Sequence, residues 1–129
     1  MKLFIVDDSA IVVERLVTLL TAIPDLEIVG QATNIKEARR LIPQFRPDVV
    51  IMDIQMPGGT GIKLLQQLKK EPDCPLILMI TGSSFPQYRK KCLAAGADYF
   101  FDKSKEFEQL LDTITNLIPQ FAASPKARE

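Results

Sequence analysis

The chain has 129 residues, which is enough for one domain with a substantial core and too short for two. Hydrophobic residues make up 47% and charged residues 25%, the proportions of an ordinary globular protein. Basic and acidic residues balance at 16 each, so no net field favours nucleic acid or an anionic membrane, and we expect neither as a partner.

The cysteines and the N-terminal residues narrow the class of protein further. Cys74 and Cys92 have no metal-ligand spacing and the sequence contains no histidine, which argues against a zinc site. They are expected to be reduced, half-buried thiols. The first apolar run is far too short for a signal peptide, and no stretch reaches membrane-spanning length, so we expect a cytoplasmic protein.

The first half of the chain alternates short apolar runs with helical patterns. Residues 3–6 are a continuous apolar run that ends at an acidic pair, as in a strand buried on both faces. Ser9 can cap the helix that follows, and residues 26–29 form the second predicted strand. Asn34, with Glu37 three residues later, resembles a capping box for a helix through residue 41.

The same alternation continues to the C-terminus. The predicted strands are residues 49–52, 76–80 and 97–101. The helix after the first of these strands begins after Thr60, and the helix after the second ends near Gly96. In the last helix, which starts at Phe107, apolar residues recur at the i, i+3, i+4, i+7 spacing of a helix lying on a core. Pro119 is predicted to end it. We expect a domain over residues 1–119 and a flexible tail or linker stump over residues 120–129.

Strands that alternate with helices, each strand almost wholly apolar, predict an α/β fold with a doubly wound parallel sheet covered on both faces. In such a sheet ligands bind beyond the carboxyl ends of the strands. The functional residues should therefore be those that end the strands, namely Asp7, Asp8, Asp53, Thr81 and Lys103.

These strand-end residues suit phosphoryl chemistry with a cation. If the first and third strands are adjacent, three carboxylates meet, and two charges about 4 Å apart repel by roughly 4 kcal/mol at an effective dielectric constant of about 20. Such groups shift their pKa values or bind a cation, and oxygen ligands alone favour Mg²⁺. Thr81 and Lys103 offer a hydroxyl and an ammonium to a phosphoryl group, and Asp53 is a competent nucleophile toward phosphorus.

Each of these residues also has a purely structural interpretation. A single aspartate after a strand, such as Asp53, is usually a turn or cap residue, and Thr81 alone would be the same. Asp7 and Asp8 could cap the first helix and complement its dipole, and Lys103 could be a solvated charge. The placement of all five at one edge of the sheet favours a functional site.

The sequence resembles the receiver domains of two-component response regulators from Lys2 to about Ile118. The resemblance implies a flavodoxin-like fold with five helices and strand order 2-1-3-4-5. The motifs that carry it are Val6-Asp7-Asp8-Ser9, Asp53-Ile54-Gln55-Met56-Pro57 with Gly61, Ile80-Thr81-Gly82, Gly96-Ala97-Asp98 and Lys103.

This resemblance implies that Asp53 is the phosphoacceptor, which takes its phosphoryl group from a phosphohistidine of a sensor histidine kinase or a phosphotransfer protein. Asp8 and Asp53 would ligate Mg²⁺ directly, with the backbone carbonyl of Gln55, and Asp7 would act through metal-bound water. Lys103 would contact the phosphoryl oxygens. The chain would be a signalling switch rather than an enzyme, catalysing only its own phosphorylation and dephosphorylation.

The resemblance also implies how the switch works. Thr81 would move inward to the phosphoryl group, for which the small Gly82 leaves room, and Phe100 would rotate into the vacated space. Phe100 could instead be a plain packing residue. The face formed by the fourth helix, fifth strand and last helix would then bind an output domain, a partner protein or a second copy of the chain. Gln55 and Ser83 would tune the phosphoryl lifetime.

One departure from the family pattern lies after Lys103, where receivers commonly have proline and this chain has Ser104. A cis peptide bond before a residue other than proline costs about 2.5–4 kcal/mol, so we expect a trans bond and a differently shaped loop.

Three other classes of protein share part of this pattern. Phosphatases of the haloacid-dehalogenase type carry Asp-x-Asp on one strand, whereas Asp7 and Asp8 are adjacent here. An FMN-binding flavodoxin-like module needs a phosphate loop where these two acids would repel phosphate. A pseudo-receiver that serves only as a docking surface should have lost some of the five strand-end residues.

Overall fold

The structure, a computed structural model, describes residues 1–82 and 86–122. Within these ranges no helix combines the length and apolar character needed to span a membrane. The elements in chain order are β1 (Lys2–Val6), α1 (Ala10–Leu20), β2 (Glu27–Ala32), α2 (Ile35–Phe45), β3 (Val49–Asp53), β4 (Gln55–Met56), β5 (Gly59–Thr60), α3 (Gly61–Leu68), β6 (Leu76–Thr81), α4 (Pro86–Ala94), β7 (Tyr99–Asp102) and α5 (Phe107–Ala122).

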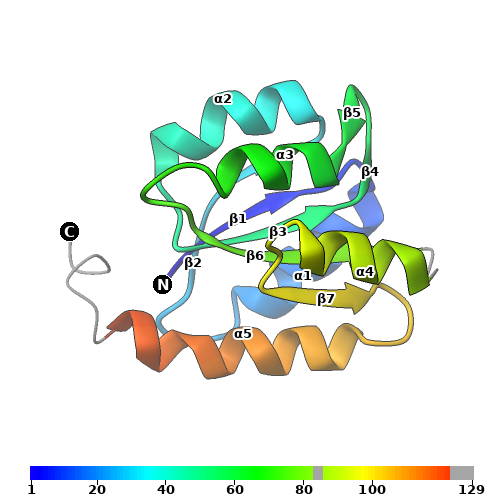
Figure 1. Ribbon diagram of the computed structural model, residues 1–129. Coiled ribbons are helices and arrows are strands. Elements are labelled where there is room, and N and C mark those ends of the chain that lie inside the picture. Colours follow the sequence, from blue (N-terminus) through cyan, green and yellow to red (C-terminus); the bar gives the residue numbers. More distant parts are fainter. Residues whose placement is uncertain (83–85, 123–129) are drawn as a thin grey trace.

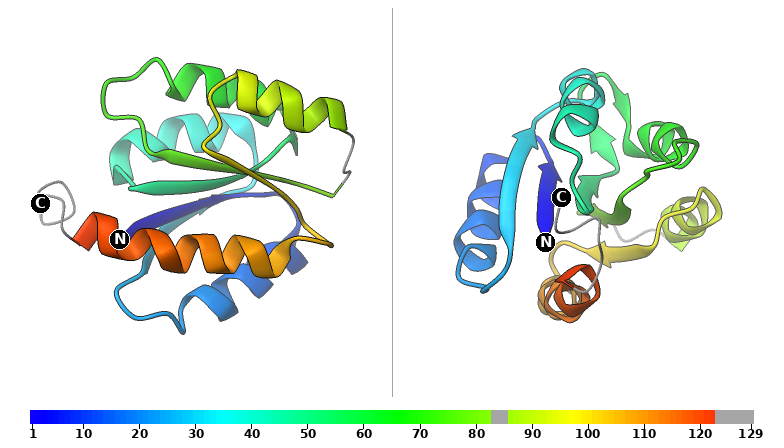
Figure 2. Two further views of the ribbon diagram at one scale, coloured as in Figure 1. Left: turned by 60° about the horizontal axis from the view of Figure 1, so that its bottom comes forward. Right: turned by 90° about the vertical axis from the view of Figure 1, so that its left-hand side faces the viewer.

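Five parallel strands form the central sheet in the order β2-β1-β3-β6-β7 (Figure 1). Counted along the chain without the short β4–β5 hairpin, this is the predicted order 2-1-3-4-5. Figure 2 shows α1 and α5 on one face of the sheet and α2, α3 and α4 on the other. The predicted doubly wound α/β fold with five helices is confirmed.

The inner strands β1, β3 and β6 are almost wholly apolar because successive side chains enter opposite cores, whereas the edge strand β2 carries the exposed Glu27 and Gln31. From β1, Phe4 and Val6 pack with the α2–α3–α4 side, whereas Leu3 and Ile5 pack with the α1–α5 side. Both cores are closed by buried helix residues, such as Leu64 from α3. With both faces of the sheet covered, the carboxyl ends of the strands are left as the edge where polar side chains can gather.

The predicted helix caps form as expected. The Ser9 side chain accepts a hydrogen bond from the Val12 amide at 3.4 Å, and the Asn34 side chain accepts one from the Glu37 amide at 2.8 Å. Caps of this kind stabilise a helix by about 0.5–2 kcal/mol each. They fix where α1 and α2 begin, directly after the loops that follow β1 and β2.

The prediction that Pro119 ends the last helix was wrong, since α5 continues to Ala122. Likewise, α2 runs past the predicted end at residue 41 and contains Pro43. A proline forfeits one hydrogen bond in a helix interior. Packing outweighs that loss, because Leu117 lies in the α1–α5 core before Pro119 and Phe121 packs against that core after it.

Candidate phosphorylation site

Three carboxylates converge at the carboxyl edge of the sheet. Asp7 follows β1 and Asp53 ends β3, and these neighbouring strands pair in a register that sets Val6 opposite Met52. Asp8 is the next residue after Asp7. One carboxylate oxygen from each of the three acids lies within 4.8 Å of the others. The structure therefore brings together the acidic group that the strand ends predicted.

Lys103, which follows strand β7, reaches this cluster with its side chain. Its ammonium lies 2.7 Å from Asp7 Oδ2 and 2.9 Å from Asp53 Oδ2. Its backbone amide donates a hydrogen bond to the carbonyl oxygen of Thr81 at 2.8 Å, continuing the pairing of β6 with β7. A single cation thus bridges two acids that come from different strands.

Backbone groups orient the two bridged carboxylates. Asp7 Oδ1 accepts a hydrogen bond from the Ser9 amide at 2.8 Å, and Asp53 Oδ1 accepts one from the Gln55 amide at 3.3 Å. Gly61 lies directly against Asp53, because a Cβ atom there would overlap the Asp53 carbonyl oxygen. Each acid therefore presents its second oxygen, Oδ2, to the lysine.

Burial makes the electrostatics of the site strong. Asp7 is 0% exposed and Asp53 only 6%. Burial raises the pKa of Asp53, and the hydrogen bond and charge of Lys103 only partly offset this. For Lys103, burial alone would lower the pKa, but the hydrogen bonds and charges of Asp7 and Asp53 outweigh it and raise the pKa. Lys103 is consequently a cation held by the two acids at neutral pH.

The remaining predicted site residues lie around this centre. Thr81 ends β6 and is buried, whereas Gln55 is exposed at the start of β4. Apart from its chain neighbours, no atom of the described residues lies within 4 Å of where a Cβ of Gly82 would be, so these residues leave open space there. Ser83, predicted to tune the phosphoryl lifetime, lies outside the described residues.

Phe100, the predicted switch aromatic, points into the α2–α3–α4 core and is 5% exposed. The Arg89 guanidinium of α4 covers its ring at 4.8 Å from the ring centroid. Arg89 also donates to the Phe100 carbonyl oxygen at 3.4 Å and to Glu106 Oε1 at 2.7 Å. This burial is compatible with a switch residue and with a packing residue alike.

A functional candidate that sequence reasoning missed lies directly before Lys103 and contacts the loop after it. No peptide bond in the described ranges is cis, so Lys103–Ser104 is trans as expected. Asp102 is 3% exposed and accepts hydrogen bonds from Ser104. An aspartate two residues before a serine is a turn signal that could have indicated this contact.

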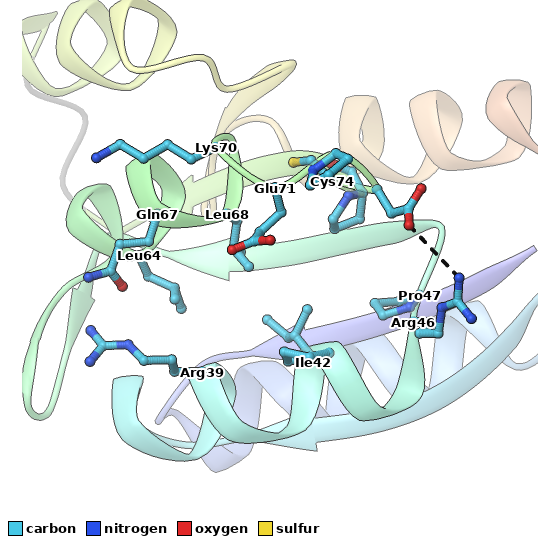
Figure 3. A pocket seen from close by; sticks show the side chains of 14 residues that line it. Arg39, Ile42, Arg46, Pro47, Leu64, Gln67, Leu68, Lys70, Glu71 and Cys74 are labelled. Carbon is cyan, nitrogen blue, oxygen red and sulfur yellow. Dashed lines mark hydrogen bonds and ion pairs between the residues drawn. The ribbon is translucent and has the colours of Figure 1, made fainter.

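The described residues line cavities at different places on the domain. One of about 430 Å³ is lined by Asp7, Asp8 and residues of α1 and β2, and so adjoins the acidic cluster. A larger one of about 630 Å³ lies between α2 and α3, where Ile42 and Leu64 face each other and Arg46 pairs with Asp73 at 3.9 Å (Figure 3). Its loops precede β3 and β6, so it lies at the amino edge of the sheet, away from the carboxylates.

Fold and site together define a class: an α/β domain with three acids and a bridging lysine beyond the carboxyl ends of its central strands. The model of the response regulator receiver domain matches residues 3–115. The chain belongs to this family and is a receiver domain of two-component response regulators.

Similar proteins agree with this assignment. The DNA-binding transcriptional activator DevR/DosR of Mycobacterium tuberculosis is 35% identical over 108 residues, covering 83% of this chain and 50% of that protein. A protein-glutamate methylesterase/protein-glutamine glutaminase of Carboxydothermus hydrogenoformans is 37% identical over 121 residues, covering 91% of this chain and 35% of that protein. The chain thus spans half or less of the length of these two relatives.

A solved structure gives the same result. The crystal structure of a LuxR-family DNA-binding response regulator from Staphylococcus aureus superposes with a TM-score of 0.82 at 30% identity, covering 91% of this chain and 98% of that one.

Proposed function

We propose that Asp53 accepts a phosphoryl group from a phosphohistidine of a sensor histidine kinase or phosphotransfer protein. The observation that carries this proposal is the Lys103 ammonium between Asp53 and Asp7, beside a cluster of three carboxylates. A carboxylate that only caps a turn needs no buried lysine partner. Here a nucleophile and a cation that can neutralise a phosphoryl group are preassembled.

Mg²⁺ fits the same cluster. The available ligands are carboxylate oxygens from Asp7, Asp8 and Asp53, with no nitrogen or sulfur donor, which suits a hard divalent cation. We propose Asp8, Asp53 and the Gln55 backbone carbonyl as direct ligands, with Asp7 acting through bound water. When bound, the ion would supply charge neutralisation at the phosphoryl oxygens.

The residues of the chain carry the transfer itself. A carboxylate oxygen of Asp53 attacks phosphorus, and the new O–P bond forms as the P–N bond to the donor imidazole breaks, with its electron pair returning to nitrogen. Lys103 neutralises a phosphoryl oxygen, the Thr81 hydroxyl donates to another, and the open space at Gly82 admits the group. In the same scheme Gln55 and Ser83 influence how long the phosphoryl group persists.

The output follows as a shift between two conformations. Phosphorylated Asp53 would favour the one in which Thr81 is drawn inward and Phe100 repositions, changing the face made by α4, β7 and α5. Moving an equilibrium from 1:99 to 99:1 needs about 5.5 kcal/mol, which two charge-assisted contacts in a partly buried site can supply. That face would bind an output domain, a partner protein or a second copy of the chain.

The regulator as a whole is a further proposal, because the chain spans half or less of the relatives described above. We propose that the receiver, predicted to end at residue 119, extends to the end of α5 at Ala122, and that the residues after it belong to a tail or linker. One relative is named as a DNA-binding activator and the other as a methylesterase, so relatives of this receiver carry different outputs.

The proposal is tested with Mg²⁺ and acetyl phosphate, followed by intact mass spectrometry. We expect one phosphate adduct on the wild-type chain and none on Asp53→Asn. Asp112→Asn is the matched control. Asp112 is an exposed aspartate of α5, so this variant should gain the same single adduct as the wild type. A wild-type chain that gains no adduct, or that turns over many equivalents of acetyl phosphate, would contradict the proposal.

A further inference from the structure

A buried carboxylate organises the turn that carries Lys103. Asp102 ends β7, and its Oδ1 accepts three hydrogen bonds: from the Ser104 amide at 2.8 Å, the Ser104 hydroxyl at 2.7 Å and the Lys105 amide at 3.0 Å. An aspartate that accepts from groups two and three residues ahead folds the backbone into a tight turn. Lys103 lies inside that turn.

The backbone closes the same turn. The Glu106 amide donates to the Asp102 carbonyl oxygen at 3.0 Å, and the Asp102 amide donates to Glu106 Oε1 at 3.1 Å. On the other side, the Lys103 amide donates to the Thr81 carbonyl oxygen at 2.8 Å. The main chain of Lys103 is thus fixed to the neighbouring strand and to the start of α5.

This fixation matters because a lysine ammonium sits on a flexible four-carbon stem. The ammonium of Lys103 reaches Asp7 and Asp53 at once, at 2.7 and 2.9 Å. Only a narrow range of Cα positions allows both contacts, since a displaced stem would have to give up one of the two acids.

We propose that Asp102 is a positioning residue for Lys103, and that Ser104 completes its turn with donors that a proline would lack. This rests on the proposed function of Asp53 and Lys103. A proline at position 104 has neither an amide N–H nor a hydroxyl, so it would remove two of the three donors to Asp102 Oδ1. The carboxylate turn of this chain is therefore a chemical alternative to a proline turn and is incompatible with one.

The test measures the rate of phosphorylation by acetyl phosphate with Mg²⁺, which needs no kinase docking. Asp102→Ala and Ser104→Pro should each slow phosphorylation, by up to about 100-fold if the ammonium moves by about 1 Å. Asp102→Asn keeps an Oδ1 acceptor and should retain most of the rate. Asp112→Ala, the exposed matched control, should leave the rate unchanged.

A double-mutant cycle separates positioning from a general structural role. If Asp102 acts through the ammonium, Asp102→Ala should not slow phosphorylation further in a Lys103→Met background. Equal slowing in both backgrounds would overturn the inference while leaving phosphorylation of Asp53 intact. Urea unfolding checks each variant, and if Asp102→Ala does not fold, the cycle is run with Ser104→Ala. A wild-type chain without any phosphate adduct would instead refute the proposed function, and the positioning role with it.

Discussion

Replacing Lys103 by methionine should convert the site from one that is stable by itself into one that depends on a divalent cation. The substitution keeps an apolar stem and removes the ammonium that bridges Asp7 and Asp53. Two buried carboxylates then face each other without a counter-charge. Removing one partner of a fully buried ion pair costs about 3–5 kcal/mol.

The loss of stability expected for Lys103→Met is smaller than in a fully buried pair. The Lys103 side chain is 16% exposed, so solvent screens part of the interaction, and we expect a loss of about 2–3 kcal/mol in the free energy of unfolding. Protonation of Asp53, whose pKa burial already raises, limits the loss further at low pH. Mg²⁺ should restore stability, because saturation at about 100 times Kd adds about 2.7 kcal/mol to whichever protein binds it.

The assay is urea unfolding of the wild type and of Lys103→Met, each with EDTA and with Mg²⁺, together with calorimetric titration of the ion. The variant should be less stable than the wild type in EDTA. It should bind Mg²⁺ more tightly, by about tenfold if 1.4 kcal/mol of the lost stabilisation is recovered by the ion. Equal stability in EDTA and equal Mg²⁺ affinity would refute the claim that Lys103 neutralises the cluster.

Three further predictions concern the packing around the site and the two thiols. Gly61→Ala should lower the free energy of unfolding by at least about 2 kcal/mol, because its Cβ would overlap the Asp53 carbonyl oxygen, whereas Gly82→Ala, with open space around it, should change stability by less than about 0.5 kcal/mol in the same urea titrations. Burial raises the pKa of Cys92 from 9.0 to about 11, so the folded chain holds this proton more tightly than the unfolded chain. Stability should therefore fall as pH rises from about 9 to 11, by up to roughly 2–3 kcal/mol, and a Cys92→Ala variant with an unchanged alkaline slope would refute this. In native protein a thiol reagent should label the half-buried Cys74 well before the buried Cys92, and equal rates would contradict the burial described here.

Sequence reasoning predicted the site because its physical signal is local. An apolar run that stops at an acid, as at Asp7 and Asp53, marks both the end of a buried strand and a polar group at its carboxyl edge. The caps at Ser9 and Asn34 are equally local, since each side chain bonds an amide three residues ahead. Patterns of this range are visible in a single sequence.

The features that sequence reasoning missed depend on contacts between residues distant in the sequence, or on whether local preference or core packing is stronger. Proline by itself disfavours continuation of a helix. At Pro119 this preference is outweighed by the packing of Leu117 and Phe121, so α5 continues. Asp102 was not among the predicted site residues, because its role depends on the hydrogen bonds that its side chain accepts from the loop at Ser104. The contact of Arg89 with Glu106 joins residues 17 positions apart and leaves no periodic trace.

The guanidinium over Phe100 affects the timing of any conformational change on this face. Before the ring can leave its buried position, Arg89 must release the ring, the Phe100 carbonyl oxygen and Glu106, or move with them. Where these contacts must break, they add to the free-energy barrier of the change. In the proposed switch, the phosphoryl group would set how often the face is found in each state, whereas Arg89 would influence how fast it passes between them.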